Sequence, residues 1–152
     1  MTNPATNLTS EPTTNLSNET SPDPIETKCK HILHPTGLHE FLLTDFTMSG
    51  ADAFLTQIGR LYEGRTGTDA PLLLIMNSPG SLPISYSLQR GKELMSQDPD
   101  VGLVRIAVLS DSLFETHLVD SFMRLIRFPG IKMRFFASTK RPEAEKWLVE
   151  GK

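Results

Sequence analysis

Two serine hydroxyls lie in a short loop where they could act as nucleophiles or phosphate acceptors. The loop is Asn77-Ser78-Pro79-Gly80-Ser81, and it follows the apolar run 71–76. A serine attacks a carbonyl only when a neighbouring base, usually a histidine held by a carboxylate, takes its proton. The one histidine downstream is His117, which lies within a predicted helix. The sequence therefore favours a turn that connects a strand to a helix.

The same string resembles a loop of Clp-type serine peptidases, in which Asn-Ser-Pro-Gly after an apolar strand helps to build the oxyanion hole. The resemblance covers only these few residues. Ser110 and Ser112 stand where a downstream nucleophile would be sought, but the small-residue stretch expected around it is missing. A serine hydrolase is therefore the least favoured of three hypotheses about function.

The sequence gives no support for a metal site or a bound cofactor. His31 and His34 lie three apart on a predicted strand, which places their side chains on opposite faces. Cys29 is the single cysteine, so no cysteine-based zinc or iron–sulfur site can form within one chain. Neither glycine-rich nucleotide-binding motif occurs in the chain. We expect no cofactor.

Basic side chains recur near the C-terminal end and could form a patch that binds an anionic membrane surface or an acidic partner. A solvated face that balances acidic residues elsewhere is the favoured interpretation of these residues. They come from the end of one predicted helix, the next strand and the loop beyond it: Arg124, Arg127, Lys132, Arg134, Lys140 and Arg141.

Composition divides the 152 residues into a tail and one domain. Residues 1–27 are rich in Thr, Asn, Ser and Pro and carry four acidic and no basic side chains, so we expect a disordered tail. The remainder, 28–152, is nearly neutral, which gives no reason to expect nucleic-acid binding. A lone cysteine, with neither a signal sequence nor an apolar run of membrane-spanning length, predicts a cytoplasmic protein.

Changes of hydrophobic period predict the order ββαβαβαβα in this domain. A hairpin of 29–33 and 38–46 precedes a helix from Ser49 to about Gly64, with Ser49 and Asp52 as a capping box. The apolar run 71–76 predicts a central strand. The later elements are a helix with Ile84, Leu88, Leu94 and Met95 on its apolar side, a strand at 103–109, a helix at 112–128, an edge strand at 131–136 and a last helix beginning near Pro142.

Alternating strands and helices after a hairpin predict an α/β fold, with a mixed, mainly parallel five-stranded sheet covered by helices. Three segments in this order resemble the second half of SpoIIAA-like proteins, in the STAS/SEC14 group: Arg105–Leu109, Ile131–Phe136 and Arg141–Leu148. The match in element order spans about 28–150. The resemblance implies a STAS fold.

STAS domains are non-enzymatic interaction modules, and related domains carry apolar ligands. The resemblance therefore implies a regulatory or protein-interaction domain, in signal transduction, that acts on a protein partner through the surface at 77–88. The alternative is a SEC14-like carrier of a lipid or small apolar ligand. In anti-sigma-factor antagonists the comparable loop reads Asp-Ser-Ser-Gly and is phosphorylated, which makes Ser78 and Ser81 candidate phosphoacceptors. Asn77 in place of the aspartate, and the inserted Pro79, depart from that motif.

Overall fold

The computed structural model describes residues 23–97, 100–111 and 129–151. Five strands form one mixed sheet in the order β1-β2-β3-β4-β5, in which β1 is antiparallel to β2 and the other neighbours are parallel. The predicted class and strand number are confirmed. The strands are β1 (Cys29–Leu33), β2 (His39–Leu43), β3 (Leu72–Asn77), β4 (Val104–Ser110) and β5 (Ile131–Ala137).

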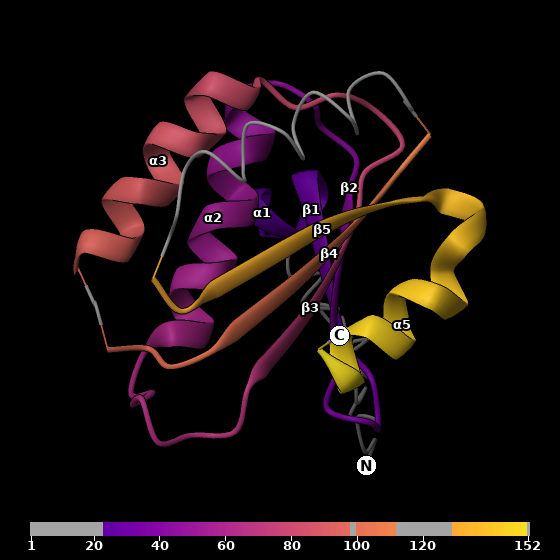
Figure 1. Cartoon of the computed structure of the whole chain (residues 1–152). Helices are drawn as coiled ribbons and strands as arrows, with labels where there is room; N and C mark the ends of the chain where they lie inside the picture. The colour runs from indigo at the N-terminus through magenta and orange to yellow at the C-terminus, as the bar shows by residue number, and fades with distance from the viewer. Residues whose placement is uncertain (1–22, 98–99, 112–128, 152) are drawn as a thin grey trace, which may run out of the picture.

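Helices cover both faces of this sheet. Figure 1 shows α1 (Pro24–Lys28), α2 (Met48–Tyr62) and α3 (Ile84–Gln97) on one side, and α5 (Arg141–Glu150), which follows a short 3-10 turn at Ser138–Lys140, on the other. The first face packs a core of Phe41, Leu74, Ile106 and neighbours against α2. On the second face of the sheet, Ile75, Ala107 and Leu109 pack against α5. The residues of α5 that face them are Ala144, Trp147 and Leu148, as predicted.

The strand positions follow from side-chain burial. In β3 and β4, both faces are covered, which explains their nearly continuous apolar sequences. β3 is central and β5 is an edge strand, as the sequence predicts. In β5 the basic residues Lys132 and Arg134 are exposed and alternate with half-buried apolar residues.

Two of the predicted boundaries are wrong at the start of α2. β2 ends at Leu43 rather than at residue 46, because its partner β1 begins at Cys29, opposite Leu43, and the preceding residue, Lys28, belongs to α1. The helix is capped by Thr47, whose hydroxyl accepts from the N–H of Ser49 at 3.2 Å. The capping box of Ser49 and Asp52 is therefore wrong, since Ser49 already lies inside the helix.

Helix α1 begins within the segment assigned to the tail. The side chain of Asp23 accepts from the N–H of Ile25 at 3.0 Å and caps the helix, while Ile25 packs against the core. The remaining tail residues, 1–22, lie outside the described residues, as does the helix predicted at 112–128. Among the residues that are described, no helix is long and apolar enough to cross a bilayer.

A buried ion pair ties α5 to β2 across 101 positions of sequence. The two terminal nitrogens of Arg141 donate to the two carboxylate oxygens of Glu40, at 2.7 and 2.8 Å, and His34 Nε2 lies 2.7 Å from the second oxygen. The side chain of Glu40 is 9% exposed. These hydrogen bonds, that from Arg141 above all, lower the pKa of Glu40, whereas burial opposes them.

Two histidines of the hairpin contact each other on the α2 side of the sheet. His31 Nε2 lies 2.9 Å from His39 Nδ1, and the His31 ring stacks on Phe41 with centroids 4.7 Å apart. Burial lowers the pKa of both imidazoles, and for His39 the neighbouring His31 and Arg65 lower it further. Both rings are therefore held in the neutral form, because two imidazolium charges at this distance would repel.

This pair predicts a loss of stability in weak acid. The unfolded chain takes up protons near the ordinary histidine pKa of about 6.5, whereas the folded chain resists them. The stability that the two neutral rings contribute is present above that pH. It is lost as the pH falls toward the lower pKa of these histidines in the folded chain. We expect a lower urea midpoint at about pH 5.5 than at about pH 7.5, with a smaller difference in His31→Gln/His39→Gln. An unchanged difference in the double variant would contradict the assignment to these rings.

Candidate functional site

The serine loop lies at the carboxyl end of β3, where the sequence places it. Asn77 is the last residue of the strand and pairs with Leu42 on one side and Leu109 on the other. The N–H of Ser78 donates to the carbonyl of Leu109 at 3.0 Å. The loop therefore starts from the middle of the sheet, at its carboxyl edge.

The two candidate serines occupy different environments. Ser78 is 3% exposed, and its hydroxyl donates to the carbonyl of Gly80 at 2.7 Å. The hydroxyl proton of Ser78 therefore already takes part in a hydrogen bond within the turn. Ser81 is exposed and lies before Ile84, the first residue of α3. Of the two, Ser81 is the hydroxyl that a kinase could reach without opening the loop.

A close contact explains why the loop contains glycine. A side chain at Gly80 would place its first carbon 2.7 Å from the ring of Phe46, closer than such atoms approach in proteins. The loop therefore packs directly on the segment that leads from β2 into α2. Gly80 and the hydrogen bond of Ser78 together hold the loop in a compact shape.

The buried hydroxyl gives a testable stability effect. Ser78→Ala removes the donor and leaves the Gly80 carbonyl without it, so we expect a loss of about 1 kcal/mol in the free energy of unfolding. Ser96→Ala is the matched control, because Ser96 also donates to a backbone carbonyl but is exposed. Urea titration of both variants measures the difference. Equal losses of unfolding free energy in the two variants would show that the hydrogen bond of the buried Ser78 stabilises the fold no more than that of an exposed serine.

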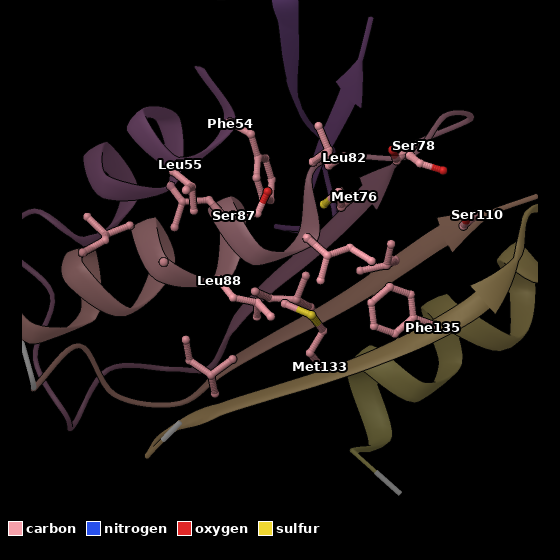
Figure 2. Close-up of a pocket in the computed structure, with 18 of the residues that line it drawn as sticks. Phe54, Leu55, Met76, Ser78, Leu82, Ser87, Leu88, Ser110, Met133 and Phe135 are labelled. Atoms are coloured by element: carbon pink, nitrogen blue, oxygen red, sulfur yellow. The ribbon is translucent and has the colours of Figure 1, made fainter. Parts of the chain in front are cut away.

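An apolar pocket opens beside this loop, between the sheet and helices α2 and α3. Figure 2 shows Phe54 and Leu55 from α2, Leu88 from α3, and Met133 and Phe135 from β5 directed toward the same space. The described residues enclose a volume of about 160 Å³. Every described lining residue is apolar, glycine, tyrosine or serine.

Four serines are among the residues that line the pocket: Ser78, Ser81, Ser87 and Ser110. Of these, Ser78 follows β3 and Ser110 ends β4, at the carboxyl edge of the sheet. The hydroxyl of Ser87 donates to the carbonyl of Pro83 at 2.9 Å, so it too is engaged by the backbone. Ser110, named above as a candidate nucleophile, ends β4 and lines the pocket, whereas Ser112 and His117 lie outside the described residues. The site is thus a mainly apolar hollow with four serines in its lining.

Helix α3 is amphipathic, yet none of its side chains is fully buried. Its apolar residues Leu88, Leu94 and Met95 line the pocket, and Leu94 and Met95 also pack against the core while remaining partly exposed. It packs on α2 through small residues, with a Cβ at Gly59 reaching within 3.2 Å of Leu94. The apolar face of α3 therefore still has surface that a further apolar group could cover.

Of the six basic residues considered for a patch or a solvated face, the structure describes four, and these four have different surroundings. Lys132 and Arg134 are exposed, and the Arg134 guanidinium lies 5.1 Å from the centroid of the Phe136 ring. Arg141 instead pairs with Glu40 and Glu145, and Lys140 pairs with Glu143. Arg124 and Arg127 lie outside the described residues.

Sequence reasoning found the loop but missed the pocket behind it. Residues that line it were assigned only to helices and strands: Met76 to the central strand, Met95 to the apolar side of a helix and Phe135 to the edge strand. The signal that could have indicated the pocket is the weak amphipathic pattern of α3, with Gly91 where a larger side chain would fill the space.

Among the described residues, no three His, Cys, Asp or Glu side chains gather into a group that could hold a metal ion. Comparisons of the chain with protein-family models, with curated proteins and with solved structures found no match.

Proposed function

We propose that this chain is a non-enzymatic, STAS-like protein-interaction domain with a regulatory role, and that it binds its partner through the serine loop, α3 and the pocket between them. The mainly parallel sheet and the order of its elements are compatible with that fold. The segments that resemble SpoIIAA-like proteins occupy β4, β5 and α5. The observation that carries the proposal is the apolar pocket beside the loop.

The size of the pocket favours a side chain over a whole lipid. A cavity of about 150 Å³ takes a molecule the size of benzene, whereas drug-sized ligands occupy roughly 300–1,000 Å³. At about 160 Å³, this pocket fits one large apolar side chain. Protein interfaces are commonly anchored in this way, by an aromatic or aliphatic residue inserted into a preformed pocket. The exposed Ser81 stands beside the opening, where a phosphate would change the charge of the docking surface.

Small aromatic probes test the pocket directly. We expect toluene and indole, which stand for phenylalanine and tryptophan side chains, to shift the methyl NMR signals of Met76, Met95 and Met133. Met48 is 57% exposed and does not line the pocket, so its signal is an internal control.

A pair of adjacent variants controls for the location of binding. Leu88→Asp places a charge in the pocket and should abolish the shifts, whereas Gln89→Asp changes an exposed neighbour and should leave them unchanged. If neither probe shifts the three methionines, the chain itself fills this space and the proposed binding site is wrong.

A carrier of a small apolar ligand is the second candidate, since the same lining would accept one. Native mass spectrometry of the gently purified full chain distinguishes the two. A reproducible added mass that disappears in Leu88→Asp would favour the carrier. A bare polypeptide mass, together with binding of the aromatic probes, would favour the interaction domain.

A further inference from the structure

The outer edge of β5 combines two features that specify a partner. Its inner edge pairs with β4 over Ile131–Ala137, and no described strand pairs with its other edge. An edge strand presents backbone N–H and C=O groups that can pair with another extended chain. The question is what kind of chain fits here.

The hydrogen-bond pattern identifies the residues whose backbone groups point outward. The N–H of Val104 donates to the carbonyl of Gly130 at 2.8 Å, and Val104 is the register partner of Ile131. In a parallel ladder this pattern directs the N–H and C=O of residues 130, 132, 134 and 136 toward β4. The N–H and C=O of Ile131, Met133 and Phe135 therefore point away from the sheet.

The two faces of β5 carry different kinds of side chain, so an added strand would need a different kind on each face. Ile131, Met133 and Phe135 are half-buried and line the apolar pocket. Lys132 and Arg134 stand on the opposite face, exposed, and among the described residues neither forms an ion pair. An added strand would need apolar side chains on the pocket face and acidic ones on the other.

Self-pairing of this edge is unfavourable. A two-fold axis perpendicular to the sheet at Met133 would place Lys132 of each copy opposite Arg134 of the other, and an axis at Arg134 would place the two Arg134 side chains together. Like charges directly opposite each other on neighbouring strands destabilise the pairing. Basic residues on an edge strand also protect it against aggregation, which fits the same reasoning.

We propose that the outer edge of β5 binds an extended segment of a partner protein in which acidic and apolar residues alternate, and that this segment adds a sixth strand to the sheet. The acidic residues contact Lys132 and Arg134, and the apolar residues extend the lining formed by Met133 and Phe135. This inference goes beyond the proposed function, because it concerns the sheet edge and holds whether or not the pocket takes an anchor.

A labelled peptide of alternating valine and glutamate tests the proposal on the full chain by fluorescence anisotropy. We expect binding that weakens with salt, weakens about tenfold or more in Lys132→Glu/Arg134→Glu, and is absent for a valine–lysine peptide. Met133→Pro removes an outward N–H without removing a bond to β4, whereas Met133→Ala removes the same side chain and keeps that N–H. The proline variant should lose binding and the alanine variant should retain it.

Three results would overturn the proposal. The first is equal binding of the two peptides. The second is equal binding by the proline and alanine variants. The third is binding of anionic phosphatidylserine vesicles, but not of the peptide, through Lys132 and Arg134. If Met133→Pro does not fold, as judged by circular dichroism, the comparison of the two peptides on the unaltered chain decides the matter.

Discussion

Replacement of Arg141 by alanine is expected to remove about 2–4 kcal/mol from the free energy of unfolding. The guanidinium makes two hydrogen bonds to the buried carboxylate of Glu40, and removal of one partner leaves a charge in the protein with its main counter-ion gone. The expected loss of unfolding free energy extends to smaller values than those of fully buried ion pairs, because the Arg141 side chain is 36% exposed. Urea unfolding at neutral pH measures the loss.

Lys140 provides the matched control, since it precedes Arg141 in sequence. Its ion pair with Glu143 is formed by side chains that are 55% and 60% exposed, so Lys140→Ala should cost less than about 1 kcal/mol. The lowered pKa of Glu40 adds a second signature. Its stabilising contribution is present above the ordinary carboxyl pKa and is lost as the pH falls through the folded value. Arg141→Ala should reduce that acid sensitivity, and equal losses in the two variants would contradict the account.

Replacement of Gly50 by alanine is expected to cost about 3 kcal/mol or more, although alanine normally favours a helix. The added carbon would lie 2.6 Å from the carbonyl carbon of Asp45 and closer still to its oxygen, so the backbone at the entry of α2 would have to move. Calorimetry or urea titration would show the loss as a reduced midpoint.

Gly91 is the control for helix propensity. It lies in α3, and a carbon added there would approach no atom more closely than Leu55, at 4.0 Å. Gly91→Ala should therefore raise stability by about 0.5–1 kcal/mol. The two glycine-to-alanine substitutions thus have opposite expected signs. A neutral or stabilising Gly50→Ala would contradict the described path of the chain from β2 into α2.

The sequence predicted the elements whose burial is periodic and misplaced two boundaries at the entry of α2. The apolar run in β3 and the alternation in β5 reflect local burial, so both were placed correctly in the sheet. The end of β2 depends on where its partner β1 begins, since Lys28 before it belongs to α1. The cap of α2 is Thr47 rather than the better-matching motif at Ser49. Thr47 is also a favoured N-cap residue, so two local signals competed there, whereas the start of β1 is not indicated by the residues of β2.

The candidate site shows the same division. The serine loop contains Pro79 and Gly80, two residue types that favour turns, so its place after β3 could be predicted from the sequence. The position of Ser78 depends on the carbonyl of Leu109, and the packing of Gly80 depends on the ring of Phe46; both partners lie outside the loop. Arg141 was considered only for a basic patch or a solvated face, because its partner Glu40 lies 101 residues away.

Site-specific photo-crosslinking in cells tests the central claim most directly. A photoreactive phenylalanine analogue at Leu82, which lines the pocket beside the loop, is compared with the same analogue at Leu33, which is 62% exposed at the end of β1. The account predicts a discrete cross-linked partner protein from position 82 that is absent from position 33 and is lost when Leu88→Asp is added. Cross-links from position 82 that stay within the chain, or the same products from both positions, would contradict a protein-binding site at this pocket.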